Sequence, residues 1–287
     1  MGAADVVPGV SGGTIAFISG IYEELITTIN NINLSLLKSL KTDGFKVFWK
    51  KLNGNFIMAL LLGIGVSILS LAKFISWLME NNPIALWSFF FGLVVASVFL
   101  MGKEIKKWNF QSIGMFIIGA IAAYYITTLP PTENVEALPY LFFSGALAIC
   151  AMILPGISGA FILVLLGSYK TILDALHQHD FKIIITVGMG IVFGLLSFAR
   201  LLKWMFTHYK NATMAILTGF ILGSLNKIWP WKKVLETKTF DDKILVIKDQ
   251  NISPFAYDGD PQIMTGILLA IFGFSLIFIL EKLAAKK

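Results

Sequence analysis

Long apolar segments separated by short polar ones run along most of the chain. A helix needs about 20 apolar residues to cross the hydrocarbon core of a bilayer. Five segments meet this requirement, and a sixth, 212–229, is slightly short but equally apolar. The six segments are 56–79, 84–102, 110–129, 183–206, 212–229 and 262–281. This pattern predicts an all-α polytopic membrane protein.

Two further apolar segments are interrupted by residues that break helices. The first reads DVVPGVSGGTIAFISGIY, from Asp5 to Tyr22, and the second reads LPGISGAFILVLLGSY, at 154–169. The segment 139–175 is long enough to enter the membrane and return, which predicts a re-entrant helical hairpin, and 5–29 resembles only its second arm. The two segments match at one constant spacing, which pairs Pro8 with Pro155, Gly9 with Gly156, Ser11 with Ser158, Gly12 with Gly159, Gly20 with Gly167 and Tyr22 with Tyr169.

The composition agrees with a membrane protein. Only 14% of the residues are charged and 56% are hydrophobic, whereas soluble domains carry about 25% charged residues. The net charge of +6 therefore reports mainly on membrane topology and does not indicate a nucleic-acid partner. The single cysteine, Cys150, cannot form an internal disulfide.

The distribution of lysine and arginine predicts the orientation in the membrane. If the 30–55 loop is cytoplasmic, most of the basic residues lie on that side, and so does the C-terminus. The short loops on the other side then carry only Lys170 and Lys182. This arrangement requires 139–175 to cross an even number of times or not at all. Three crossings therefore separate the two interrupted segments, which enter from opposite sides.

The similarity between the two halves extends beyond the interrupted segments. SLAKFISWL at 70–78 resembles SFARLLKWM at 197–205, which pairs Lys73 with Arg200. We therefore expect two inverted-topology repeats, a usual construction of secondary transporters. The first repeat, 1–138, contains the arm 5–29, the cytoplasmic loop 30–55 and three spanning helices. The second repeat, 139–287, contains the hairpin 139–175, three spanning helices and an outside loop, 230–261. In that loop a short strand or hairpin is expected near 243–249.

The broken helices form the candidate binding site. Irregular backbone at membrane depth is tolerated only where it is buried in protein or lines a wet cavity. We expect helices at 14–29 and 160–175 to begin near the midplane with unpaired N–H groups and a positive dipole end. Such helix starts suit a phosphate or a carboxylate. Tight helix packing through Gly and Ser is the alternative, but two copies in inverted register favour a binding or translocation site.

Three charged residues add to this candidate site. Lys73 and Arg200 each lie a few residues inside the end of a span. They either snorkel to the interface or guide an anion on each side of the membrane. Asp5 has no acidic counterpart, because Met152 holds its place in the second copy. It is a candidate proton acceptor or partner of a cation.

The sequence predicts no catalytic residue, no metal site and no cofactor. Its histidines, His177, His179 and His208, lie in or next to loops, and a metal site needs more ligands than are visible there. Phosphatase chemistry commonly uses a nucleophile together with histidine or a metal cluster. An integral-membrane lipid phosphatase is therefore disfavoured.

The two interrupted segments resemble the signature segments of the prokaryotic polyprenyl-phosphate transporters, formerly a domain of unknown function. The resemblance covers essentially the whole chain. It implies a flippase that returns undecaprenyl phosphate, the lipid carrier for cell-wall sugars, from the outer to the inner leaflet of the bacterial cytoplasmic membrane. It also implies a phosphate-binding role for the matching residues, which are Pro8, Gly9, Ser11, Gly12, Gly13, Thr14, Pro155, Gly156, Ser158 and Gly159.

In one respect the chain departs from this family pattern. Similar proteins usually have a further apolar arm before the first motif, in the place that 139–154 occupies in the second copy. Here Met1 shortly precedes Asp5, so we expect the N-terminal arm to be truncated. The expected partners are the lipid and the bilayer, and the sequence sets no oligomeric state. A secondary transporter of a small soluble anion would have the same architecture and remains the main alternative.

Overall fold

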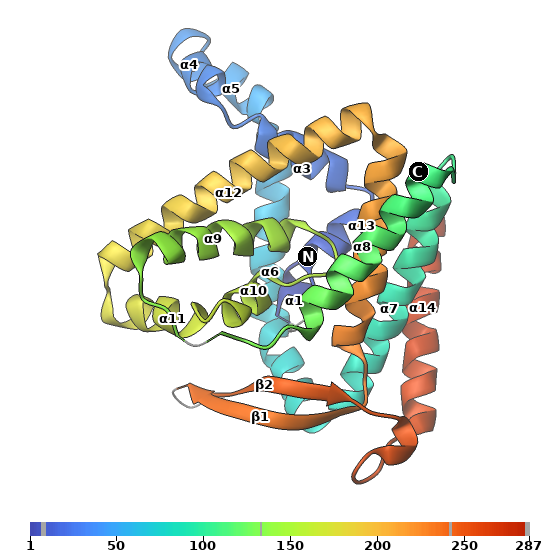
Figure 1. Ribbon diagram of the computed structural model, residues 1–287. Coiled ribbons are helices and arrows are strands. Elements are labelled where there is room, and N and C mark those ends of the chain that lie inside the picture. Colours follow the sequence, from blue (N-terminus) through green and yellow to red (C-terminus); the bar gives the residue numbers. More distant parts are fainter. Residues whose placement is uncertain (7–9, 133, 241–242, 285–287) are drawn as a thin grey trace.

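The structure is a computed structural model that describes residues 1–6, 10–132, 134–240 and 243–284. Helices make up most of it (Figure 1). Four are long and apolar enough to cross a membrane: α6 (Gly54–Asn81), α7 (Pro83–Glu104), α8 (Phe110–Thr128) and α12 (Phe181–His208). The prediction of a polytopic helical membrane protein is thereby confirmed.

The other two predicted spans also form helices. Helix α14 runs over Ile263–Ala284, and α13 runs over Lys210–Ser224 before a 3-10 turn, η1 (Leu225–Ile228). The regular helix therefore ends before residue 229, where the span was expected to end. At 15 residues, α13 is shorter than the roughly 20 residues that cross a bilayer. It is also largely buried, because it packs between α7 and α8.

Close helix pairs at glycines build the centre of the bundle. Helix α7 packs along α14, and α13 packs along α8. At Gly92 of α7 a side chain would collide with the backbone of Ala270 in α14, and at Gly219 of α13 it would collide with Phe116 in α8. The reverse contacts exist as well, since Gly273 of α14 lies against Phe89 and Gly119 of α8 lies against Ile216. Small residues allow this close approach of helix backbones in membranes.

Each interrupted segment forms three short helices. The first gives α1 (Gly2–Asp5), α2 (Gly12–Ile18) and α3 (Tyr22–Asn30), and the second gives α9 (Leu138–Ile153), α10 (Gly159–Leu165) and α11 (Tyr169–Gln178). Helix α9 packs against α12, and α1 packs against α6.

The expectation of continuous helices at 14–29 and 160–175 was wrong. A second break divides each of them, and α10 and α11 meet at an angle of 104°. Gly20 (φ 75°) and Gly167 (φ 65°) lie in these breaks. Glycine adopts positive φ without steric cost, so these equivalent glycines let the chain turn where a helix would otherwise continue.

Two small elements lie at opposite ends of the molecule (Figure 1). Helices α4 (Leu34–Thr42) and α5 (Phe45–Leu52) project from one end. At the other end β1 (Lys232–Phe240) and β2 (Lys243–Asn251) form an antiparallel hairpin, which η2 (Pro254–Ala256) follows. The strand predicted near 243–249 is therefore confirmed. We refer to the two ends as the α4–α5 side and the hairpin side.

Candidate functional site

The two motif segments touch each other inside the bundle. The Ser11 hydroxyl oxygen lies 3.3 Å from the carbonyl oxygens of both Met152 and Leu154. The Thr14 hydroxyl accepts a hydrogen bond from the backbone N–H of Gly156 at 2.8 Å. Side chains of the first motif thus bind the backbone at the start of the second, more than one hundred residues further along the chain.

A glycine makes this contact possible. A Cβ atom on Gly13 would lie 2.5 Å from the carbonyl oxygen of Ile153 and 3.0 Å from that of Met152. Real Cβ atoms do not approach backbone oxygens so closely, so residue 13 must be glycine for α2 to pack against the end of α9. The phosphate-binding role that the family resemblance implies for Gly13 stays a prediction, and the structure adds a packing role.

The start of α2 is closed by groups of the chain itself. The Ser11 hydroxyl accepts from the Gly13 N–H at 3.1 Å, and the Asp5 carboxylate accepts from the Gly12 N–H at 2.7 Å. Ser11 and Thr14 are each only 1% exposed. Asp5, expected as a proton acceptor or a partner of a cation, therefore caps the start of α2, and its expected roles stay predictions.

The start of α10 is open by comparison. Ser158 is partly exposed, and its side chain does not cap the helix. In the described part of the chain its hydroxyl has no hydrogen-bond partner. Gly156 has a φ of 92°, which favours glycine, and a side chain there would meet Ser224 of α13. Buried Pro155 precedes it, and Gly159 lies against the backbone of Ala148 in α9.

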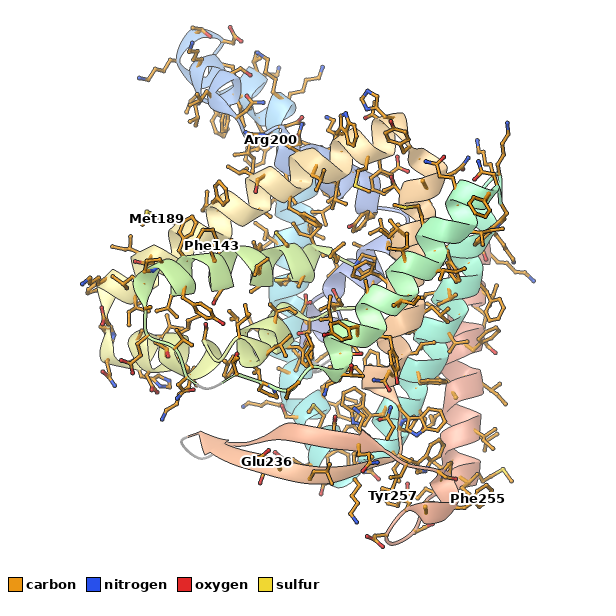
Figure 2. The ribbon with its side chains drawn as sticks, viewed as in Figure 1. Phe143, Met189, Arg200, Glu236, Phe255 and Tyr257 are labelled. Atoms are coloured by element: carbon orange, nitrogen blue, oxygen red, sulfur yellow. The ribbon has the colours of Figure 1, made fainter. Side chains whose placement is uncertain are left out.

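The remaining predicted residues are not gathered at this contact. Pro8 and Gly9 lie outside the described residues. Lys73 is exposed on α6 and Arg200 is exposed on α12, on the side away from α9 (Figure 2). Within the described ranges neither cation forms a hydrogen bond or an ion pair. Their roles as cations that guide an anion therefore stay predictions.

A charged cluster on the hairpin side escaped the sequence analysis. The Asp249 carboxylate of β2 lies 3.1 Å from the Lys227 ammonium of η1 and 3.0 Å from the Lys232 ammonium of β1. Lys232 also donates to the backbone oxygen of Lys227 at 2.6 Å. Lys227 lies 22 residues and Lys232 lies 17 residues before Asp249, and the hairpin brings the three side chains together. The signal in the sequence was the alternating KILVIKD, which predicts a strand but not its contacts.

Two aromatic rings complete this cluster. The Lys227 ammonium lies 5.2 Å from the ring centre of Phe161 in α10, and the Lys232 ammonium lies 5.1 Å from that of Trp87 in α7. Burial alone would raise the pKa of Asp249, but Lys232 and Lys227 outweigh it and hold the pKa below its ordinary value. Burial also lowers the pKa of Lys232, against the opposing effect of Asp249. The carboxylate is therefore charged at neutral pH and shared by two cations.

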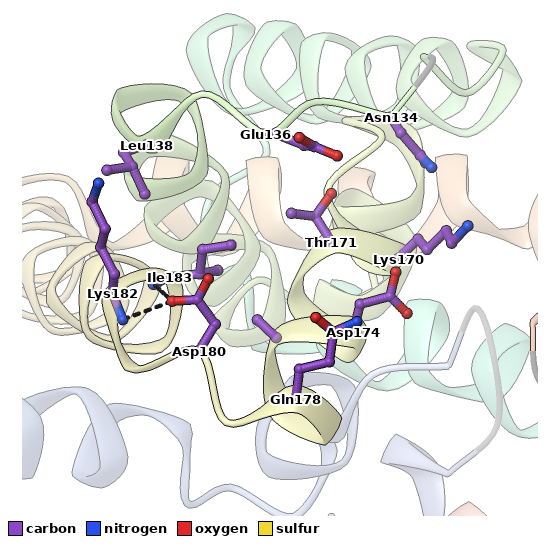
Figure 3. Close-up of a pocket in the computed structure, with 11 residues that line it drawn as sticks. Asn134, Glu136, Leu138, Lys170, Thr171, Asp174, Gln178, Asp180, Lys182 and Ile183 are labelled. Carbon is purple, nitrogen blue, oxygen red and sulfur yellow. Dashed lines mark hydrogen bonds between the residues drawn. The ribbon is translucent and has the colours of Figure 1, made fainter.

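Two hollows lie away from the motif contact. One, of about 390 Å³, opens beside α11 and the start of α12, and its charged lining includes Glu136, Lys170, Asp174, Asp180 and Lys182 (Figure 3). The other, of about 300 Å³, lies on the α4–α5 side, where Glu23, Glu104 and Glu281 line it together with the buried Tyr22. In the described ranges, no three His, Cys, Asp or Glu side chains are grouped so as to hold a metal ion.

Comparisons with known proteins identify the family. Residues 1–244 match a family described as undecaprenyl phosphate translocase-like. A polyprenyl-phosphate transporter of Vibrio cholerae is 45% identical over 291 residues, which cover 100% of this chain and 94% of that protein. A polyprenyl-phosphate transporter of Staphylococcus aureus is 31% identical over 248 residues, or 80% of this chain and 83% of that protein. No solved structure matches the chain. The chain belongs to the undecaprenyl phosphate translocase-like family.

Proposed function

We propose that the chain moves a polyprenyl phosphate, such as undecaprenyl phosphate, from one leaflet of the membrane to the other. Two similar proteins are named polyprenyl-phosphate transporters. The structural observation that carries the proposal is the contact between the two motif segments, where Ser11 and Thr14 bind the backbone at Met152, Leu154 and Gly156. Two helix breaks thereby meet among the spanning helices.

The phosphate headgroup is the part of the lipid that needs a protein. A charged phosphate loses its hydration in hydrocarbon at a high free-energy cost. Backbone N–H groups, hydroxyls and a cation replace that hydration while the isoprenoid tail stays in lipid. In this proposal the headgroup passes the second motif, at Gly156, Ser158 and Gly159, because Ser158 is partly exposed and its hydroxyl has no partner among the described residues.

We place the hairpin side outside and the α4–α5 side in the cytoplasm. The loop that contains α4 and α5 carries Lys38, Lys41, Lys46, Lys50 and Lys51, and cytoplasmic loops are enriched in such residues. The C-terminus is then cytoplasmic as well. In a bacterial cytoplasmic membrane the proposed direction is from the outer to the inner leaflet, for reuse of the carrier in cell-wall synthesis.

Two inverted repeats, 1–138 and 139–287, underlie this route. The reciprocal glycine contacts support them. Gly92 contacts Ala270 as Gly219 contacts Phe116, and Gly273 contacts Phe89 as Gly119 contacts Ile216. A two-fold pseudoaxis that exchanges α7 with α13 and α8 with α14 produces such pairs. Each motif would then face one side of the membrane, as alternating access requires.

Transport into one leaflet of reconstituted vesicles tests the proposal. Proteoliposomes that contain the purified chain are expected to move undecaprenyl phosphate from one leaflet to the other faster than protein-free vesicles do. A soluble phosphate ester is added as competitor, and release of inorganic phosphate is measured in parallel. Transport of the ester without movement of the lipid would instead indicate a carrier of small anions. Release of phosphate would indicate a phosphatase.

A further inference from the structure

The cluster on the hairpin side holds more positive than negative charge. Lys227 and Lys232 share Asp249, and in the described part of the chain no other carboxylate bonds to either ammonium. The three side chains are between 13% and 21% exposed. Removing charges from water is costly unless they are paired. One excess positive charge in such a place is stabilised when an anion binds.

The two lysines differ in exposure and in their acceptors. An ammonium group has three N–H donors. Lys232 donates to Asp249 and to the backbone oxygen of Lys227, and within the described residues Lys227 donates to the two oxygens of Asp249, at 3.1 and 3.4 Å. Each lysine therefore retains one donor. Lys227 is the more exposed of the two, at 21% against 13%, so its donor is the one that a ligand reaches more easily, whereas Lys232 also ties β1 to η1.

Lys227 also lies next to the second motif. Gly156 packs against Ser224, in the last turn of α13, and Lys227 follows in the adjoining turn η1. The Lys227 ammonium lies over the ring of Phe161, which is three residues beyond Ser158 in the chain. Lys227 is thus placed beside the open motif by contacts on two sides, whereas Lys73 and Arg200 are exposed on α6 and α12.

We propose that Lys227 is the cation that receives the phosphate group of the lipid on the hairpin side, and that Lys232 and Asp249 are its positioning residues. The inference rests on the proposed function, and it adds a binding residue to it. The ligand is a phosphate monoester. Asp249 holds Lys227 extended toward α10, and an arriving phosphate oxygen takes the donor that Asp249 leaves unused.

Binding of geranyl phosphate, a short soluble isoprenyl phosphate, tests the inference on the purified full-length chain in detergent. Lys227→Gln is expected to weaken binding about 10-fold, because hydrogen bonds to charged groups contribute about that factor. Lys227→Arg keeps the charge and is expected to bind within about threefold of the original chain. Lys233→Gln is the matched control, since Lys233 neighbours Lys232 on β1 but is exposed, and it is expected to change nothing.

The variant Asp249→Asn distinguishes a cluster that binds phosphate from one that only stabilises the hairpin. If the cluster only holds the hairpin, Asp249→Asn and Lys227→Gln should lower the melting temperature and the binding of geranyl phosphate alike. If Lys227 binds phosphate, Asp249→Asn removes the competing charge while the amide oxygen can still accept a hydrogen bond from Lys227 and position it, and the folded variant is expected to bind at least as tightly as the original chain. Should Asp249→Asn not fold, the contrast between Lys227→Gln and Lys227→Arg decides the question.

Two outcomes would overturn the inference. One is unchanged affinity of Lys227→Gln for geranyl phosphate, and the other is weakened binding that only follows a loss of folded protein. Inorganic phosphate is measured as a second probe. Equal affinity for both probes would assign the site to free phosphate and would contradict a lipid site. Failure of the unaltered chain to move undecaprenyl phosphate in proteoliposomes would refute the proposed function itself, which keeps the two failures distinguishable.

Discussion

The two motifs begin with the same residues, but their helix starts differ in the folded chain. At the start of α2, Ser11 and Asp5 accept hydrogen bonds from the first N–H groups, and Ser11 is buried. At the start of α10, Ser158 is partly exposed and caps nothing. The place of Asp5 is taken by Met152, which is 44% exposed. The first N–H groups of α2 are thus bonded by Ser11 and Asp5, whereas the Ser158 side chain does not cap α10.

This difference shows that a repeated motif need not have a repeated role. The first copy holds the two segments together, because Ser11 and Thr14 bind the backbone of 152–156. The second copy lies beside Lys227 and Phe161. An anion that arrives from the hairpin side would therefore find a cation and a free hydroxyl at the second motif, and a carboxylate at the first. The comparison can be tested by changing one copy at a time.

The largest effect is expected at Gly13. Gly13→Val places carbon atoms against the carbonyl oxygens of Ile153 and Met152, and such overpacking costs about 3 kcal/mol or more when backbone must move. Thermal unfolding in detergent should show a strongly destabilised protein without transport. Gly63→Val in α6, where a Cβ meets nothing, is the control and should unfold like the original chain. Normal stability of Gly13→Val would contradict the packing role of the first motif.

The next largest effect is expected when the start of α10 receives a carboxylate like that of Asp5 at the start of α2. Met152→Asp places an acidic side chain at the position equivalent to Asp5. Repulsion of the phosphate is expected to slow uptake of undecaprenyl phosphate about 10-fold, which corresponds to roughly 1.4 kcal/mol. Met152→Asn has nearly the same shape without the charge and should transport much faster. Equal uptake by the two variants would show that the start of α10 does not bind an anion.

Removal of one hydroxyl at a time should separate stability from transport. Ser11→Ala removes a buried cap and is expected to lower the free energy of unfolding by about 1–2 kcal/mol. Ser158→Ala removes a hydroxyl that has no hydrogen-bond partner in the described ranges, so stability should stay within about 0.5 kcal/mol while uptake falls severalfold. Chemical denaturation and vesicle uptake are measured for both variants. The comparison fails if Ser158→Ala loses stability and keeps full uptake.

The smallest effects are expected at the exposed cations. Lys73 and Arg200 have no ion pair within the described ranges, and both lie near the ends of their spans, where a long side chain can reach the interface. Lys73→Gln and Arg200→Gln should therefore alter uptake by less than about twofold, since surface substitutions away from binding groups change little. A strong loss in either variant would show that these residues do guide the anion and that the route runs along α6 or α12.

Several features of the fold followed from the sequence alone. The apolar helices were predictable because apolar length decides which segments can lie in hydrocarbon, and four of the helices that the structure describes are long enough to span a membrane. The breaks at the two motifs were predictable because proline and glycine interrupt helices locally. The recurrence of the motif was also visible, since the matching residues of the two interrupted segments keep a constant spacing. In each case the deciding physics acts within one segment of the chain.

Only the tertiary structure decided how each helix start is bonded and which charged side chains meet. The sequence predicted Asp5 as a proton acceptor or a partner of a cation, and folding brings its oxygen to the Gly12 N–H. The sequence also predicted Lys73 and Arg200 as guiding cations, because they match in the repeat, and it gave no sign that the hairpin gathers Lys227, Lys232 and Asp249 beside α10. Hydrogen bonds and ion pairs depend on groups that meet in space. The partners come from different helices and strands, and no local pattern of residues records that meeting.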